Sequence, residues 1–140
     1  MTGNDKPDDK TLRELMANVK TIAVVGLSTN PYKDSYRVAE YLKNHGYRII
    51  PVNPGAKEIM GQTSYPDLAS IPDPVDVVDV FRKPEYTPAI ADEAVAIGAK
   101  ILWLQLGIRN QEAKEKAKRA GLIFVQDACM LREHMRLAAA

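Results

Sequence analysis

The chain has 140 residues, of which 46% are hydrophobic and 26% are charged, a balance typical of one globular domain with a sizeable core. Its formal net charge of +1 gives no basic field of the kind that attracts nucleic acid or membranes, so we expect neither as a partner. The single cysteine, Cys129, excludes an internal disulfide framework and a cysteine-rich zinc site. The two histidines, His45 and His134, are far apart in sequence, which argues against a histidine metal site.

The start of the chain is polar. Residues 1–10 lack the apolar stretch of a signal peptide, and no apolar run approaches the ~20 residues needed to span a bilayer. We therefore expect a cytoplasmic protein that forms one domain over residues 1–140, with residues 1–9 flexible.

Apolar segments alternate with helical patterns along the chain. A helix is expected over residues 9–19, from Asp34 or Ser35 up to Gly46, from Thr87 up to Gly98, over 111–120 and over 130–137. Runs of apolar and β-branched residues predict strands covered on both faces over 21–25, 47–52, 75–81, 101–106 and 122–125. The loop-rich stretch 55–74 has room for a short helix over 67–70.

This alternation forces parallel pairing through right-handed crossovers. The prediction is an α/β fold with helices on both faces of a doubly wound sheet of five parallel strands, in the order 3-2-1-4-5. In such a sheet a ligand lies over the carboxyl ends of the strands where the order reverses, here the first and fourth.

The loop after the first strand has features of a phosphate site. Gly26 is followed by a polar loop and a helix start, a geometry that attracts phosphate, although the other two glycines of a dinucleotide fingerprint are missing. The Ser28 hydroxyl and the N–H groups near Ser35 are expected to hold phosphate oxygens, with positive charge from Lys33 and Arg37. Arg37 lies in the first helical turn, where the helix dipole disfavours a cation unless an anion is bound. An ordinary strand-to-helix connection is the alternative interpretation.

The second strand ends in Pro51, Val52, Asn53 and Pro54, where an NAD site carries an acidic residue. No carboxylate follows until Glu58. This stiff loop is suited to an adenine ring, or it only turns the chain. The missing acid argues against plain NAD.

Two more loops end at the same edge of the predicted sheet. Phe81 is predicted to line a groove, Arg82 or Lys83 to meet a phosphate, and Gln105 to form part of the groove floor. The alternative for the basic pair is a solvated turn.

No catalytic group stands out. Cys129 is better explained as a small buried thiol than as a nucleophile, because His134, five residues later, would face another side of the helix. Asp76 and Asp79 are three apart on a strand and therefore face opposite sides, so they do not form an acid–base pair.

The order and spacing of these segments resemble the small stand-alone CoA-binding proteins. That family has a Rossmann-like fold and is related to the CoA-binding domain of the succinyl-CoA synthetase alpha subunit. The resemblance covers about residues 12–137. It is carried by residues 23–28 (AVVGLS) with Pro31 and Lys33, 51–54 (PVNP), Gly61 with 65–68 (YPDL), 78–82 (VDVFR), 103–105 (WLQ) and 129–130 (CM).

The resemblance implies coenzyme A as the ligand. By this likeness the phosphates would lie at Gly26, Ser28, Lys33 and Arg37, the adenosine at Pro51, Val52 and Asn53, and the pantetheine arm along Val80, Phe81 and Arg82. One departure is Ala128, where the family often has an arginine directly before the cysteine. The catalytic histidine of the synthetase relatives lies in a second domain, which has no counterpart in this sequence.

These observations predict a protein that binds CoA or an acyl-CoA without catalysing a reaction by itself. It would act as a carrier, a sensor or an accessory module, and a protein partner remains open. One alternative is an NAD(P)- or nucleotide-dependent enzyme or redox sensor on the same fold. Another is an acyl-transfer enzyme with Cys129 as its nucleophile.

Overall fold

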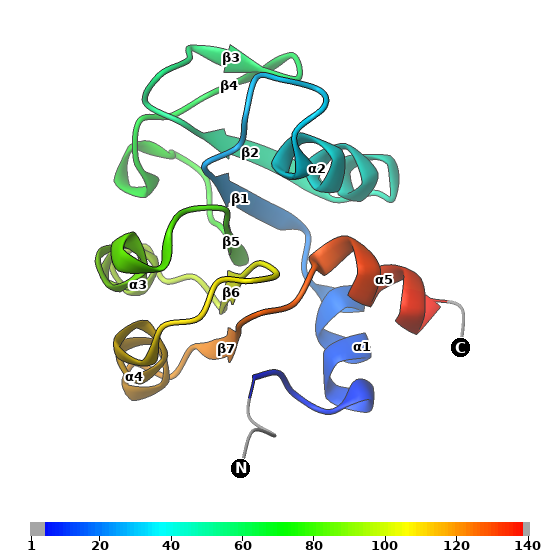
Figure 1. Cartoon of the computed structure of the whole chain (residues 1–140), viewed down its shortest axis with the longest axis vertical. Helices are drawn as coiled ribbons and strands as arrows, with labels where there is room; N and C mark the ends of the chain where they lie inside the picture. The colour runs from blue at the N-terminus through cyan, green and yellow to red at the C-terminus, as the bar shows by residue number, and fades with distance from the viewer. Residues whose placement is uncertain (1–4, 139–140) are drawn as a thin grey trace.

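A computed structural model describes residues 5–138, which form three layers with a parallel sheet in the middle (Figure 1). The sheet contains β1 (Thr21–Val25), β2 (Arg48–Val52), β5 (Val77–Val80), β6 (Ile101–Leu104) and β7 (Ile123–Val125). The helices are α1 (Asp9–Asn18), α2 (Asp34–Asn44), α3 (Thr87–Ala96), α4 (Gln111–Arg119) and α5 (Met130–Ala138). The predicted fold class is thus confirmed. None of the helices within residues 5–138 is long and apolar enough to cross a bilayer.

Four short elements complete the fold. β3 (Glu58–Ile59) and β4 (Gln62–Thr63) form a small antiparallel hairpin, which the sequence did not predict because two-residue strands carry no readable pattern. The short helix expected before Ile71 is the 3-10 turn η1 (Leu68–Ser70). A second 3-10 turn, η2 (Pro84–Tyr86), leads directly into α3.

The predicted strand order is wrong. The observed order is β2-β1-β5-β6-β7, so the third long strand lies between the first and the fourth instead of outside the second. Pro51 in β2 explains the difference, because its carbonyl accepts from Tyr65 N–H (3.0 Å) on the outer side of β2. The proline nitrogen faces the same side and has no hydrogen to offer a further strand there. The order therefore reverses between β1 and β5, and the candidate site moves to the carboxyl ends of these two strands.

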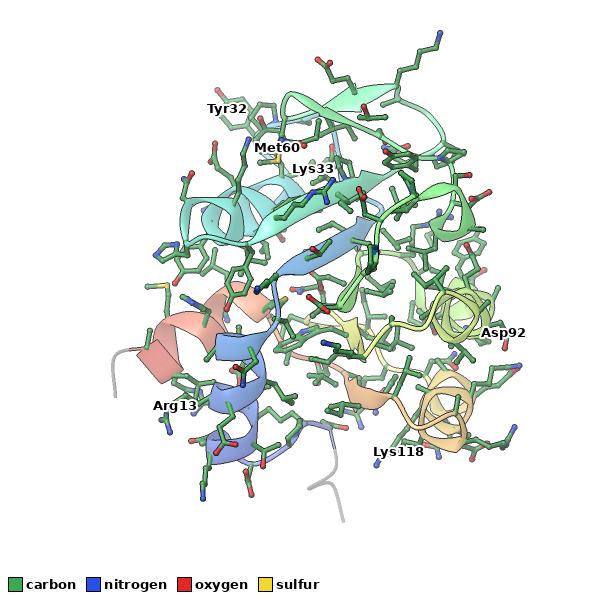
Figure 2. The ribbon with its side chains drawn as sticks, turned by 180° about the vertical axis from the view of Figure 1, so that it is seen from behind. Arg13, Tyr32, Lys33, Met60, Asp92 and Lys118 are labelled. Atoms are coloured by element: carbon green, nitrogen blue, oxygen red, sulfur yellow. The ribbon has the colours of Figure 1, made fainter. Side chains whose placement is uncertain are left out.

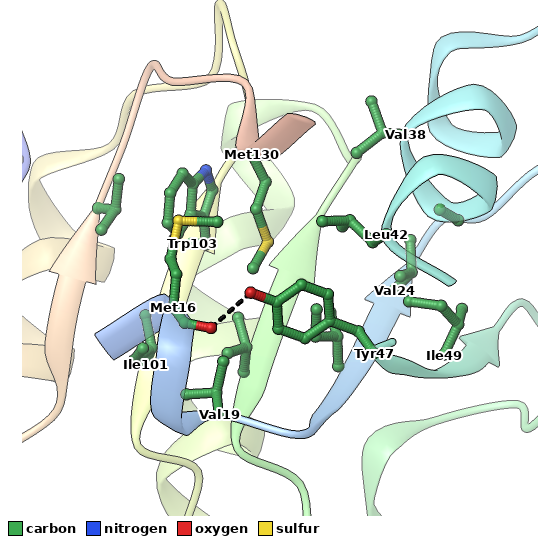
Figure 3. Packing of buried hydrophobic residues seen from close by; sticks show 14 of the residues in the cluster. Met16, Val19, Val24, Val38, Leu42, Tyr47, Ile49, Ile101, Trp103 and Met130 are labelled. Carbon is green, nitrogen blue, oxygen red and sulfur yellow. Dashed lines mark hydrogen bonds between the residues drawn. The ribbon is translucent and has the colours of Figure 1, made fainter. Parts of the chain in front are cut away.

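Two apolar cores fill the spaces between the layers. On one face of the sheet lie α1, α2 and α5, and on the other lie α3 and α4 (Figure 1). Trp103 is fully buried beneath α5, where its indole Nε1–H donates to the Ala128 carbonyl (2.8 Å). Figure 3 shows it beside Met16 and Met130, with the Tyr47 hydroxyl donating to the Met16 carbonyl. These contacts fix the chain that leads from β7 into α5.

Each edge strand of the sheet has a partner from elsewhere in the chain. Tyr65 pairs with Val52 at the end of β2. Beyond β7, the Gln126 N–H donates to the Asp5 carbonyl (2.8 Å), and the Asp5 side chain forms an ion pair with Arg109. Residues 1–9 were expected to be flexible, but Asp5 within this segment is hydrogen-bonded beside the edge of the sheet. Residues 1–4 lie outside the described part of the chain.

Candidate functional site

Gly26 lies where β1 ends, against the end of β5. Its φ of +87° is in the left-handed region, and a Cβ built on it would lie 2.6 Å from the Phe81 carbonyl oxygen. Its N–H donates to the Val52 carbonyl (2.9 Å). Only a residue without a side chain fits here, because both the backbone conformation and the close approach exclude one. Gly26 therefore lets the loops after three neighbouring strands converge.

The loop after Gly26 is ordered by its own hydroxyl groups. The Ser35 Oγ accepts from the Ser28 N–H (3.0 Å), and the Ser28 Oγ accepts from the Asn30 N–H (3.0 Å). These two N–H groups are thus used within the loop, and the two hydroxyl hydrogens are what Ser28 and Ser35 can still donate to a ligand.

The start of α2 at Asp34 agrees with the prediction, but the residue that caps the helix differs from it. Neither Asp34 nor Ser35 is the N-cap, because Lys33 holds that position and both of the others lie in the first turn. In the part of the chain that the structure describes, no side chain caps α2. Its first-turn N–H groups are therefore available to an anion. Figure 2 shows Lys33 at the end of the molecule that carries the β3–β4 hairpin.

Asn53 joins the loops after β1 and β2. Its Nδ2 donates to the Leu27 carbonyl (2.9 Å), and its Oδ1 accepts from the Gly55 N–H (2.8 Å). Both ends of the amide are thus engaged within the protein. Asn53 shapes the site by holding the two loops together.

A cleft of about 330 Å³ opens on the face of the sheet that carries α2 and α5. We call it the α5 cleft. Its walls come from the first turns of both helices and from the loops after β5 and β6. The lining residues include Arg37, Phe81, Gln105, Ile108, Cys129 and Arg132.

A second cleft of about 200 Å³ opens on the opposite face, between the β2 end and α3. We call it the α3 cleft, and its lining residues include Val52, Pro54, Asp67, Arg82, Tyr86 and Glu93. The Arg82 guanidinium lies 4.6 Å from the centre of the Tyr86 ring, a cation–π contact. Two carboxylates reach this cleft, Asp67 and Glu93, which sequence reasoning missed because they come from the N-cap of η1 and from α3.

The two clefts are neighbours across the end of β5. The consecutive residues Phe81 and Arg82 line the α5 cleft and the α3 cleft respectively. Gly26 lies against both of these residues.

Five of the residues predicted for the site line a cleft, namely Arg37, Phe81 and Gln105 in the α5 cleft and Val52 and Arg82 in the α3 cleft. The other seven line neither cleft: Gly26, Ser28, Lys33, Ser35, Pro51, Asn53 and Val80. Among these, Pro51 and Val80 are buried in strands. Pro51 and Val80 lie at the carboxyl ends of β2 and β5, beneath the loops that border the clefts.

Two arginines bring positive charge to the α5 cleft. Arg37 lies in the first turn of α2 and Arg132 in the first turn of α5. No carboxylate among residues 5–138 forms an ion pair with either one, although Asp34 also lines the cleft. Sequence reasoning found Arg37 and missed Arg132, yet the same signal, a cation in a first helical turn, marks both.

Cys129 is half-buried and lines the α5 cleft, so the expectation of a small buried thiol is confirmed only in part. His134 is no partner for it, because its Nδ1 lies 2.8 Å from the Tyr41 hydroxyl in a separate aromatic cluster with His45. Within residues 5–138, no group of three or more histidine, cysteine or acidic side chains is placed to hold a metal ion.

Asp79 is a fully buried carboxyl group beneath the α5 cleft. Its Oδ1 accepts from the Gln105 Nε2–H (2.5 Å), whereas Oδ2 has no partner. Burial raises the pKa of Asp79 to about 7, against a smaller opposing effect of the hydrogen bond from Gln105. Asp76 lies apart from it and accepts from the Lys20 and Thr21 N–H groups, so the two carboxyl groups do not form a pair.

Replacing Gly26 tests the convergence of the loops. Gly26→Ala should destabilise the protein by about 3 kcal/mol or more, since the left-handed conformation costs ~1–2 kcal/mol and the Cβ also displaces the Phe81 carbonyl. Gly98→Ala is the matched control, because Gly98 has a φ of +74° but no atom within 4 Å of the added Cβ. Urea unfolding measures both, and equal losses would contradict the steric role of Gly26.

Replacing Asp79 tests its protonation. Below about pH 7 the folded protein holds a proton that the unfolded chain releases near pH 4, so stability falls as the pH rises from about 4 to about 7. Asp79→Asn cannot ionise and should lack this fall. The stability loss between pH 5 and pH 8 should therefore be about 2–3 kcal/mol larger in the native protein than in the variant.

Asp76→Asn is the control for that experiment. Desolvation is the largest single effect on the pKa of Asp76 and acts to raise it. The Lys20 and Thr21 N–H donors and Lys100 together outweigh it, so the pKa is lowered and the group is ionised at both pH values. This variant should keep the native pH dependence. Parallel stability curves for the native protein and Asp79→Asn in urea unfolding would contradict the buried, protonated state.

The profile of a family described as the CoA binding domain matches residues 20–135. An uncharacterized protein of Bacillus subtilis (strain 168) is 37% identical over 128 residues, covering 91% of this chain and 95% of that protein. A solved structure of a hypothetical protein from Pyrococcus horikoshii OT3 has a TM-score of 0.93 and 44% identity, covering 96% and 94% of the two chains.

A longer enzyme is also similar. The ADP-forming acetate–CoA ligase II of Archaeoglobus fulgidus is 31% identical over 104 residues, which cover 71% of this chain but only 16% of the ligase. The resemblance expected from the sequence is thereby confirmed. Since the family profile spans most of the sequence, the chain belongs to the CoA-binding domain family.

Proposed function

We propose that the chain binds CoA or an acyl-CoA across the carboxyl edge of the sheet. The observation that carries this proposal is the pair of clefts on opposite faces whose linings meet at the consecutive residues Phe81 and Arg82, beside Gly26. CoA has a nucleotide at one end, a pyrophosphate in the middle and a long arm with two amides at the other end. A ligand of this shape can occupy both clefts at once.

The nucleotide end suits the α3 cleft. Pro54 and Val52 offer apolar surface to an adenine ring, and Arg82 and Tyr86 border the same space. The pyrophosphate then crosses near Gly26, between the linings of the two clefts. There the uncapped N–H groups of α2 and the Arg37 guanidinium are the groups that favour an anion.

The arm suits the α5 cleft. Phe81 and Ile108 provide apolar surface, and the Gln105 amide lies among them. The end of the arm reaches toward Cys129. We propose that the protein acts as a carrier, a sensor or an accessory module, because no described histidine lies beside Cys129 to serve as a base.

One observation favours a second candidate. The carboxylates of Asp67 and Glu93 line the α3 cleft, and a carboxylate can accept from the ribose hydroxyls of NAD. Both already have partners, however, because Asp67 accepts from the Ser70 N–H and Glu93 from the Leu68 N–H. The alternative is an NAD(P)- or nucleotide-dependent protein that uses the same edge.

Titration calorimetry with CoA, NAD and NADP separates the candidates. CoA should bind, and Arg37→Ala should weaken it about tenfold, the expected effect of losing one charged hydrogen bond of ~1.5 kcal/mol. Arg119→Ala, which removes an equal charge at the exposed end of α4, should leave the affinity unchanged. Binding of NAD or NADP without any binding of CoA would overturn the proposal.

Cys129 allows a test of the absence of catalysis. The native protein and Cys129→Ala should both leave an acyl-CoA intact, because no described base activates the thiol. A thiol-reactive dye that detects free CoA measures the reaction. Release of CoA by the native protein that is lost in Cys129→Ala would contradict a purely binding role and support acyl transfer.

A further inference from the structure

Asp79 is the group whose burial the fold alone does not explain. Among residues 5–138, its Oδ2 is the only buried side-chain nitrogen or oxygen without a hydrogen-bond partner. It lies on β5 between Val24 of β1 and Trp103 of β6, on the face of the sheet that packs against α2 and α5. An apolar side chain would be expected there, because an unsatisfied buried polar group is destabilising.

Asp79 has one contact that links it to the site. Its Oδ1 accepts from Gln105 Nε2–H, and the Oε1 of the same Gln105 amide lies 3.4 Å from the Met130 N–H at the start of α5. The two neighbours demand opposite ends of the amide, since one is an acceptor and the other a donor. Asp79, with the shorter of the two contacts, and the Met130 N–H therefore together fix which way the Gln105 amide points.

Gln105 forms part of the floor of the α5 cleft and is only 3% exposed. Its amide offers two N–H donors and two oxygen lone pairs, and the contacts with Asp79 and Met130 use one of each. One N–H and one lone pair remain. The pantetheine arm presents the same two kinds of group, because each of its amides has one N–H and one carbonyl.

We propose that Asp79 is a positioning residue for the arm of the ligand. It holds the Gln105 amide in one orientation, and that amide then recognises an amide of the pantetheine arm in the α5 cleft. This inference rests on the proposed binding of CoA and adds a residue that contacts no ligand itself. The inference predicts that a change at Asp79 weakens binding of the arm and leaves binding of the nucleotide end unaffected.

Two ligands and two kinds of substitution test the inference by titration calorimetry. The ligands are CoA and adenosine 3′,5′-bisphosphate, which keeps the nucleotide and lacks the arm. Asp79→Leu and Asp79→Val remove the acceptor, and valine matches the neighbouring Val78 and Val80 of the strand. Both variants should bind CoA about tenfold more weakly and the bisphosphate within about twofold of the native protein.

The conservative variant should rescue binding. Asp79→Asn keeps an oxygen that accepts from Gln105 Nε2, so its CoA affinity should stay within about threefold of the native value. Gln105→Leu should show the same selective loss of CoA affinity as Asp79→Val. The double variant that combines Asp79→Val with Gln105→Leu should bind CoA no more weakly than Gln105→Leu alone. Asp76→Asn, at the other end of the same strand segment, is the control with native affinity for both ligands.

Several results would overturn the inference. Native CoA affinity in Asp79→Val would do so, and so would an equal loss for both ligands, because either result removes the selective effect on the arm. Additive losses in the double variant would show that Asp79 does not act through Gln105. If the native protein binds neither ligand, the proposed function fails first, which distinguishes that result from a failure at Asp79.

Discussion

The structure depends on the contact between the backbones of Gly26 and Phe81. A side chain on Gly26 would lie 2.6 Å from the Phe81 carbonyl oxygen, so the ends of β1 and β5 come this close only because residue 26 is a glycine. Because successive side chains of an extended chain alternate in direction, Phe81 and Arg82 lie on opposite faces at this point, each in its own cleft. The two separate hollows are thus adjacent, and a ligand longer than either of them can lie across both.

The layers of the fold could be predicted from the sequence, but the strand order could not be obtained from alternation alone. Each long helix shows apolar residues at helical spacing. Each long strand shows a continuous apolar run, because parallel strands are buried on both faces. Strand order depends on pairing between distant segments, which no local pattern records. The one local clue was Pro51, since a proline inside a strand marks an edge. That clue is enough to exclude a third strand outside β2.

The candidate site was predictable where chemistry follows a strand directly, as at Gly26 and Gln105. It was not predictable where the structure uses a polar group internally, as it does with the amide of Asn53, which joins two loops. Asp79 shows the limit most clearly. Its sequence environment indicates a buried strand, yet only the packing of β5 against β6 and α5 reveals that its carboxyl group meets Gln105.

The partners of the two edge strands have a consequence for association between molecules. An open sheet ends in rows of unpaired backbone groups, which invite strands from other copies and so promote aggregation. Tyr65 covers the end of β2, and Asp5 covers the chain just beyond β7. Pro51, which has no N–H to offer, and the salt-bridged Asp5 therefore limit pairing between the two edges of the sheet and a strand of another molecule. They do so at the same end of the sheet where the clefts open.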